Sequence, residues 1–256
     1  MQLQLETQLA RVSDSLRMRG VANTARLAGK WGAWKLSPTF VNSVERSLAL
    51  RAERRFDRRF GTETRSLYDR AVTDAPSASV ADGNGYEATS RGALRLIVRS
   101  ATKRPQDWVF MDIGSGKGRV VITAATMGFR ATIGVEHSPS LARIAEENIE
   151  VFRRSYPSAP PLQSIAGDAT TIELPAEPLF VFLYNPFGEA TTAAFLENLA
   201  RSLRATPRPV VVAYLNPRHA PLFDDCPFLR RVRVVETMLV GSCNIYRSVD
   251  TEKLPG

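Results

Sequence analysis

The sequence predicts an α/β fold with a doubly wound, seven-stranded, mostly parallel sheet, preceded by an N-terminal helical extension. From residue 86 onward, short apolar runs alternate with helical patterns, which is typical of repeated β-α-β units. Two further strand patterns, at 229–236 and 238–247, follow each other with only a tight turn between them, which predicts an antiparallel pair. The length of 256 residues suits one such domain with an extension.

Five apolar runs give the parallel part of the predicted sheet. They lie at 108–113, 131–135, 163–166, 179–183 and 210–214. Helices are predicted at 93–100, 120–127, 138–152 and 190–203, and Ser138 followed by Pro139 is a typical helix start. Five strands and the closing pair make the count of seven.

Residues 1–75 are predicted to form a basic helical extension with a connecting loop, and residues 76–256 the sheet domain. Leu5, Leu9, Val12 and Leu16 share one helix face, and a second helix is expected at 39–59. Residues 1–70 hold 14 Arg and Lys against 7 Asp and Glu, a net charge of +7. This charge indicates attraction to an anionic partner, with a solvated helix face as the alternative.

Composition argues against several other classes of protein. No apolar run approaches the roughly 20 residues that cross a bilayer, and the first residues lack the pattern of a secretion signal. We therefore expect a cytoplasmic protein with no membrane contact. Cys226 and Cys243 lack metal-ligand spacing and are expected to be buried thiols, and two histidines are too few for a histidine-based metal site.

The loop after the first predicted strand reads Asp112-Ile-Gly-Ser-Gly-Lys-Gly-Arg119. Glycines at alternate positions allow a sharp turn and let the backbone approach a ligand closely. Ligands bind at this end of the strands in an open parallel sheet. A dinucleotide fingerprint is excluded because position 119 is Arg, and a P-loop is excluded because Lys117 is followed by Gly118.

The next three strand ends also carry polar residues. Glu136 lies 22 residues beyond Gly114, near the ~20-residue spacing at which an acid binds ribose hydroxyls. Asp168 follows the third strand, where its carboxylate and nearby backbone amides suit an adenine. The fourth strand ends in Asn185-Pro-Phe187, whose amide and backbone carbonyls suit the N–H groups of an attacking amine.

In this order, the four loops resemble those of class I S-adenosylmethionine-dependent methyltransferases, whose Rossmann-like sheet also has seven strands. The stretch from Phe56 to Thr64, the segment around Tyr86 and the DIGSGKGR and YNPFG motifs look similar to uncharacterised bacterial members. The glycine loop also resembles that of the non-SET histone-lysine methyltransferases. Amino-group methyltransferases of this class carry two prolines where Asn185-Pro186-Phe187 has one.

The resemblance implies S-adenosylmethionine as cofactor and a role for each loop. The implied cofactor-binding residues are Asp112, Gly114, Ser115, Gly116, Gly118, Glu136, His137, Asp168, Ala169 and Asn185. The implied acceptor-side residues are Asn185, Pro186, Phe187 and Tyr86. The expected reaction is methyl transfer to an amine of a protein or a small molecule. Transfer to oxygen or to a small metabolite, and a non-catalytic nucleoside-binding module, stay open as alternatives.

Overall fold

The computed structural model describes residues 51, 54–64, 89–237 and 241–249. The chain divides into two compact units, Met1–Ala52 and Glu53–Gly256, and the description below concerns the second. The helix predicted at 5–16, most of the one at 39–59 and most of the connecting loop lie outside the described residues. Tyr86 lies outside them as well.

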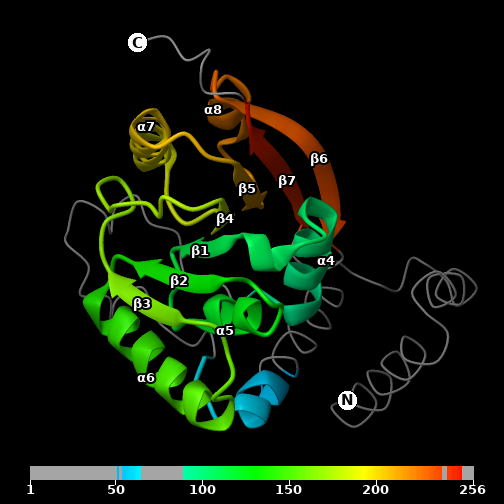
Figure 1. Ribbon diagram of the computed structural model, residues 1–256, viewed down its shortest axis with the longest axis vertical. Coiled ribbons are helices and arrows are strands. Elements are labelled where there is room, and N and C mark those ends of the chain that lie inside the picture. The colour runs from blue at the N-terminus through cyan, green and yellow to red at the C-terminus, as the bar shows by residue number, and fades with distance from the viewer. Residues whose placement is uncertain (1–50, 52–53, 65–88, 238–240, 250–256) are drawn as a thin grey trace, which may run out of the picture. The chain divides into compact units, whose positions relative to one another are not determined.

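The predicted sheet is confirmed, with seven strands in the order β3-β2-β1-β4-β5-β7-β6 (Figure 1). The strands are β1 (Val109–Ile113), β2 (Ala131–Glu136), β3 (Leu162–Ala166), β4 (Leu179–Tyr184), β5 (Val210–Leu215), β6 (Leu229–Thr237) and β7 (Gly241–Ser248). The first five pair in parallel, and β7 runs antiparallel to both β5 and β6. Each predicted strand begins and ends within a few residues of the observed one.

The four predicted helices of the sheet domain are also present. They are α4 (Arg91–Ala101), α5 (Arg119–Ala125), α6 (Pro139–Ser155) and α7 (Glu189–Ala205). Ser138 caps α6 as predicted, since its hydroxyl accepts the backbone N–H of Leu141. Two short elements were not predicted, the 3₁₀ turn η3 (Pro105–Asp107) and α8 (Ala220–Asp224), because neither is long enough to show a helical period.

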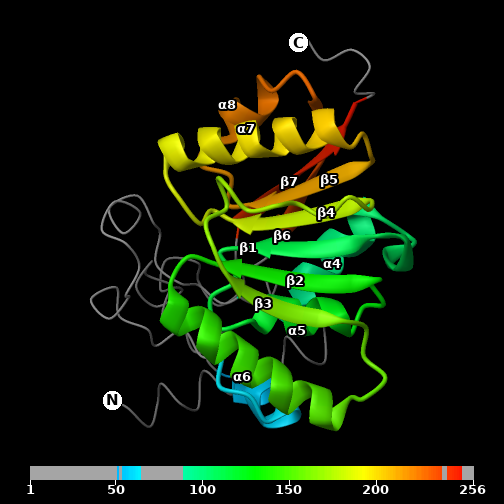
Figure 2. The same ribbon diagram turned by 60° about the vertical axis from the view of Figure 1, so that its left-hand side comes forward.

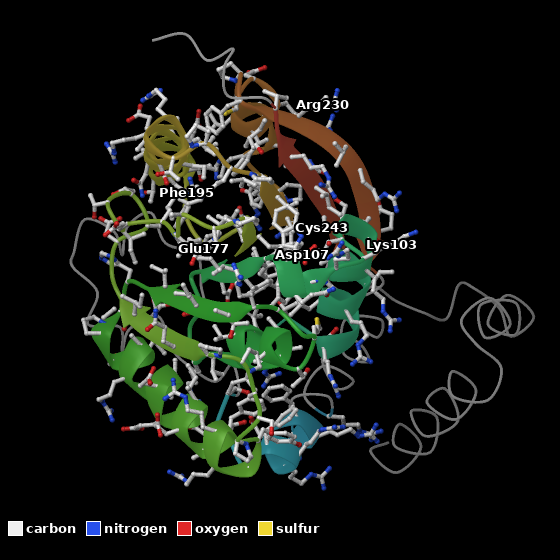
Figure 3. All side chains as sticks on the ribbon, in the orientation of Figure 1. Lys103, Asp107, Glu177, Phe195, Arg230 and Cys243 are labelled. Carbon is white, nitrogen blue, oxygen red and sulfur yellow. The ribbon has the colours of Figure 1, made fainter. Side chains whose placement is uncertain are left out.

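Helices cover both faces of the sheet, and the central strands β1, β4 and β5 are therefore buried along almost their whole length. Side chains alternate along each strand, so Phe110, Phe180 and Phe182 pack with α4 and α5 on one face. Val181 and Leu183 point to the other face and pack with α7, whose Phe195 is fully buried against the sheet (Figure 3). This two-sided arrangement is the predicted doubly wound fold.

The described helices include none that is both long and apolar enough to span a bilayer. Cys226 and Cys243 are free and buried, as expected. Burial raises the pKa of Cys226 to about 11 and that of Cys243 to about 12, which keeps both thiols protonated.

Residues 54–64 pack against the sheet unit, although the sequence assigned them to the extension. Residues 54–60 are helical, and Phe60 is only 2% exposed. Its ring lies 4.7 Å from that of Phe56 and 5.5 Å from those of Phe152 and Tyr156, measured between centroids. An aromatic cluster thus joins this segment to α6.

The strand order places a topological switch point in the middle of the sheet. β1 pairs with β2 on one side and with β4 on the other, and the chain reverses its direction of winding between them. Figure 2 shows β1, β2 and β4 ending at the same edge, on the left of the view. In open parallel sheets, ligands bind beyond this switch point.

We expect Phe60→Ala to lower the free energy of unfolding of the sheet unit by about 3–5 kcal/mol, the usual cost of truncating a buried phenylalanine. Urea denaturation followed by circular dichroism measures the effect. Leu96→Ala is the control, because Leu96 is 46% exposed. Equal stability of both variants would show that residues 54–64 are not part of this unit.

Candidate cofactor and acceptor site

The loop between β1 and α5 has a backbone that only glycine adopts readily. Gly114, Gly116 and Gly118 have φ angles of +78°, +52° and +81°. A Cβ on Gly114 would lie 2.7 Å from Cβ of Pro186, and one on Gly118 would lie 3.1 Å from Cβ of Ala145. Gly114 and Gly118 are therefore required both by dihedral angle and by space, and Gly116 is required by dihedral angle, as the sequence indicated.

Hydrogen bonds inside the protein fix the shape of this glycine loop. The N–H groups of Gly114 and Ser115 donate to the carbonyl of Val135, at 2.9 and 3.0 Å. The N–H of Gly116 donates to Oε2 of Glu136 at 2.7 Å. These bonds occupy the N–H groups of Gly114, Ser115 and Gly116 inside the protein.

Glu136, at the end of β2, holds the loop through its side chain. Besides Gly116, it accepts the N–H of Ser138 at Oε1 with a distance of 3.0 Å. Burial raises the pKa of Glu136, and the backbone N–H groups of Ser138, Gly116 and His137 oppose that rise. The carboxylate has four lone-pair sites and accepts three backbone N–H groups, so one site remains for the predicted contact with a ribose hydroxyl.

Asp112, in β1, is a buried carboxyl group close to Glu136. Burial raises its pKa well above the usual range, and the negative charge of Glu136 raises it further. No ion pair compensates Asp112 among the residues that the structure describes. Neighbouring carboxyl groups, one buried (Asp112) and one half-buried (Glu136), favour a positively charged ligand, because a cation would stabilise both ionised forms.

The residues that follow β2 and β3 lie at the same sheet edge. His137 is half-buried next to Glu136, and Ala169 is buried. Asp168 is exposed, and its Oδ1 accepts the N–H and the hydroxyl of Thr170, at 2.8 and 2.7 Å. These bonds close a turn and leave Oδ2 of Asp168 as the oxygen suited to a ligand.

The corner after β4 brings Asn185, Pro186 and Phe187 next to the glycine loop. Asn185 is buried and has a φ of +40°, which is uncommon for a residue other than glycine. Its Oδ1 accepts the hydroxyl of Tyr214 at 3.0 Å. Phe187 is half-buried and packs against Phe195 of α7, with ring centroids 6.4 Å apart. The corner is thus anchored in the core.

Sequence reasoning missed a second layer of residues that ties residues 63–64 to the glycine loop. Nζ of the buried Lys117 lies 2.9 Å from Oε1 of Glu63. The buried Arg119 donates to Oγ1 and to the carbonyl of Thr64, at 2.9 and 3.0 Å. Lys117 and Arg119 belong to the recognised glycine motif. Their partners lie more than 50 residues earlier in the sequence, and no local sequence pattern reveals a pairing over that separation.

Asn148 of α6 joins the same two segments from the other side. Its Nδ2 donates to the carbonyl of Glu63 at 3.1 Å and to that of Lys117 at 3.0 Å. Its Oδ1 accepts the N–H of Glu63 at 2.8 Å. A buried polar residue inside an amphipathic helix was the signal available in the sequence.

Part of the chain matches a known family. Residues 84–157 match the profile of the family described as histone methylation protein DOT1. The match agrees with the resemblance of the glycine loop to histone-lysine methyltransferases, and it spans that loop, β2 and α6. No curated protein sequence matches the chain.

Solved structures that resemble this chain include two that are described as RNA methyltransferases. A proposed RNA methyltransferase from Pyrococcus horikoshii superposes with a TM-score of 0.52 at 14% identity, over 77% of this chain and 98% of that one. An RNA methyltransferase from Salinibacter ruber, bound to S-adenosylhomocysteine, gives a TM-score of 0.43 at 24% identity, over 66% of this chain and 97% of that one. The chain therefore has the same Rossmann-like α/β fold as the Pyrococcus horikoshii protein.

We expect Asp112→Asn to stabilise the ligand-free protein at neutral pH by roughly 1–3 kcal/mol. A carboxyl group with a raised pKa binds its proton more tightly in the folded than in the unfolded state. Its contribution to stability is therefore full at low pH and is lost as pH rises through the folded-state pKa. The side-chain amide of Asn does not ionise, so the variant does not lose stability in this way as the pH rises.

Urea denaturation of both proteins across a pH series measures this difference. The gap between Asp112→Asn and the native protein should widen as pH rises. Asp168→Asn is the matched control, because Asp168 is exposed at the same sheet edge. A gap that does not vary with pH would contradict the assignment of a buried, uncompensated charge to Asp112.

Proposed function

We propose that this chain is an S-adenosylmethionine-dependent methyltransferase that acts on an amine nitrogen of a protein or a small molecule. The observation that carries the proposal is the contact between the glycine loop and the Asn185-Pro186 corner. The position of a Cβ on Gly114 lies 2.7 Å from Pro186, so a ligand bound beside the loop also lies beside the corner. Cofactor and acceptor sites are then adjacent, as a direct transfer requires.

The residues of the loop fit this cofactor. The sulfonium and ammonium groups of S-adenosylmethionine carry positive charge, which complements the buried carboxyl group of Asp112 and the half-buried one of Glu136. Glu136 has one acceptor site left for a ribose hydroxyl, and we assign Asp168, with His137 and Ala169, to the adenine. We assign the bend at Gly114, Ser115, Gly116 and Gly118 to the methionine portion.

The cofactor supplies an electrophilic methyl group, and the protein supplies position. Asn185 and the carbonyl of Pro186 orient the N–H groups of the amine so that its lone pair faces the methyl carbon. Phe187, anchored on Phe195, is the proposed wall that limits the access of water. The sequence resemblance implies the same role for Tyr86, which lies outside the described residues. No dedicated base is required, because the methylated amine loses its proton to solvent.

Two findings bear on the acceptor. The matched family is described as one of histone methylation proteins, which favours an amine on a protein. The basic residues among 1–70, with a net charge of +7 (14 basic minus 7 acidic), favour attraction to an anionic partner. We propose that an anionic partner binds the basic helices of this extension.

The proposal is tested by incubating the protein with methyl-labelled S-adenosylmethionine and cell extract. Label is expected in protein or in small molecules, on a bond that resists mild alkali, as an N-methyl group does. Alkali-labile label would indicate transfer to oxygen. A bound cofactor with no label transferred to any fraction would indicate a nucleoside-binding module without catalysis.

We expect Glu136→Ala to weaken cofactor binding by about 1–3 kcal/mol, the scale of lost hydrogen bonds to a charged group. The loss has two sources, the ribose contact and the released N–H of Gly116. Titration calorimetry with S-adenosylhomocysteine measures it. Glu147→Ala is the control, since Glu147 is an exposed residue of α6 paired with Arg143. Unchanged affinity in Glu136→Ala would rule out the ribose assignment.

A further inference from the structure

We infer that Tyr214 is a positioning residue that fixes the orientation of the Asn185 side-chain amide toward the acceptor. The inference rests on the proposed function, since it concerns the residue proposed to hold the amine. Nothing in the motifs pointed to Tyr214, which the sequence placed at the end of an apolar strand.

The two residues come from neighbouring strand ends. Tyr214 is the next-to-last residue of β5, which pairs in parallel with β4, and Asn185 follows the last residue of β4. The hydroxyl of Tyr214 lies 3.0 Å from Oδ1 of Asn185, and both residues are buried. A hydrogen bond between buried groups is strengthened by the low local dielectric.

The direction of this hydrogen bond is determined by its partners. The hydroxyl of Tyr214 also accepts the backbone N–H of His219 at 3.3 Å, so its own hydrogen is available for Asn185. Burial raises the pKa of Tyr214, which keeps that hydrogen in place. Oδ1 can only accept, so the oxygen of the amide faces β5 and the NH₂ group faces away from it.

The hydroxyl is held in place by its ring. Tyr214 is 1% exposed, and its ring packs on that of Phe223 with centroids 4.8 Å apart. The terminal torsion of a side-chain amide is intrinsically broad, with no sharp preference between its two orientations. The hydrogen bond from Tyr214 favours the orientation in which Oδ1 faces β5.

Tyr246 of β7 provides a matched control in the same hydrophobic cluster. Its ring lies 5.4 Å from that of Phe223, and its buried hydroxyl also makes two hydrogen bonds. They run to Asp224 and from Asn244, both at 3.1 Å, and neither involves Asn185. Tyr246→Phe thus removes a comparable hydroxyl without touching the proposed site.

The test compares Tyr214→Phe and Tyr246→Phe in the full chain. With the labelled acceptor fraction as substrate, Tyr214→Phe is expected to lower kcat roughly 10- to 100-fold, the effect of a misplaced reacting group. Its affinity for S-adenosylhomocysteine should stay within about twofold. Tyr246→Phe should keep the native kcat. In an Asn185→Ala background, Tyr214→Phe should have no further effect, because the group that it positions is absent.

A second measurement needs no acceptor. The side-chain amide signals of Asn185 in ¹⁵N-labelled protein are expected to move in Tyr214→Phe and to stay in place in Tyr246→Phe. Unmoved signals in Tyr214→Phe would overturn the inference, whatever the activity of the protein. An equal loss of kcat in both tyrosine variants would also overturn it, because the effect would then be structural.

The outcomes separate this inference from the proposed function. If Asn185→Ala lowers kcat and Tyr214→Phe does not, the acceptor site stands and the positioning role is wrong. If Asn185→Ala keeps full activity, the acceptor assignment itself fails, and the role of Tyr214 in catalysis fails with it.

Discussion

The contact between Gly114 and Pro186 is the constraint around which the site is built. It joins the end of β1 to the corner after β4, across the switch point of the sheet. Because a Cβ on Gly114 would lie 2.7 Å from the proline, the two loops approach as closely as a backbone without a side chain allows. The glycine loop and the corner after β4 are therefore in close contact, and a side chain added at Gly114 would displace Pro186 or the loop itself.

Charge at this edge of the sheet carries a cost in stability. Asp112 is buried and Glu136 is half-buried, and loss of solvation is the largest cause of the raised pKa of each. Glu136 regains part of that cost from the N–H groups that it accepts, whereas the negative charge of Glu136 adds to the cost at Asp112. Strain and uncompensated polarity of this kind are typical of functional sites.

The sequence predicted the sheet well because its strands are buried on both faces. Runs such as 179–183 and 210–214 are apolar throughout, so their positions can be recognised without knowledge of their neighbours. Because the strands could be recognised, the positions at their carboxyl ends could be recognised too. The glycine motif lies at the end of β1, and Glu136 is the last residue of β2. Their geometric setting is confirmed, while their roles in binding stay predictions.

The undetected features all depend on contacts between distant parts of the chain. The partners of Lys117 and Arg119 lie at 63 and 64, and Asn148 joins those segments from α6. In the sequence, Tyr214 is only one more residue of an apolar strand. In the structure, its hydroxyl donates a hydrogen bond to Oδ1 of Asn185. Local pattern identifies which loops carry chemistry, but the residues that hold those loops are defined by tertiary packing.

A comparison inside the chain separates structural from chemical roles for the corner after β4. β5 also ends in an Asn-Pro pair, and Asn216 has a φ of +51°, close to the +40° of Asn185. The N–H of Asn216 donates to the carbonyl of Ser242 at 2.9 Å, which is a sheet contact. Left-handed asparagine before proline is therefore a way in which this chain ends a strand, and by itself it indicates no chemistry. What distinguishes Asn185 is its buried amide, oriented by a tyrosine and placed against the glycine loop, and these features argue for a role beyond the turn.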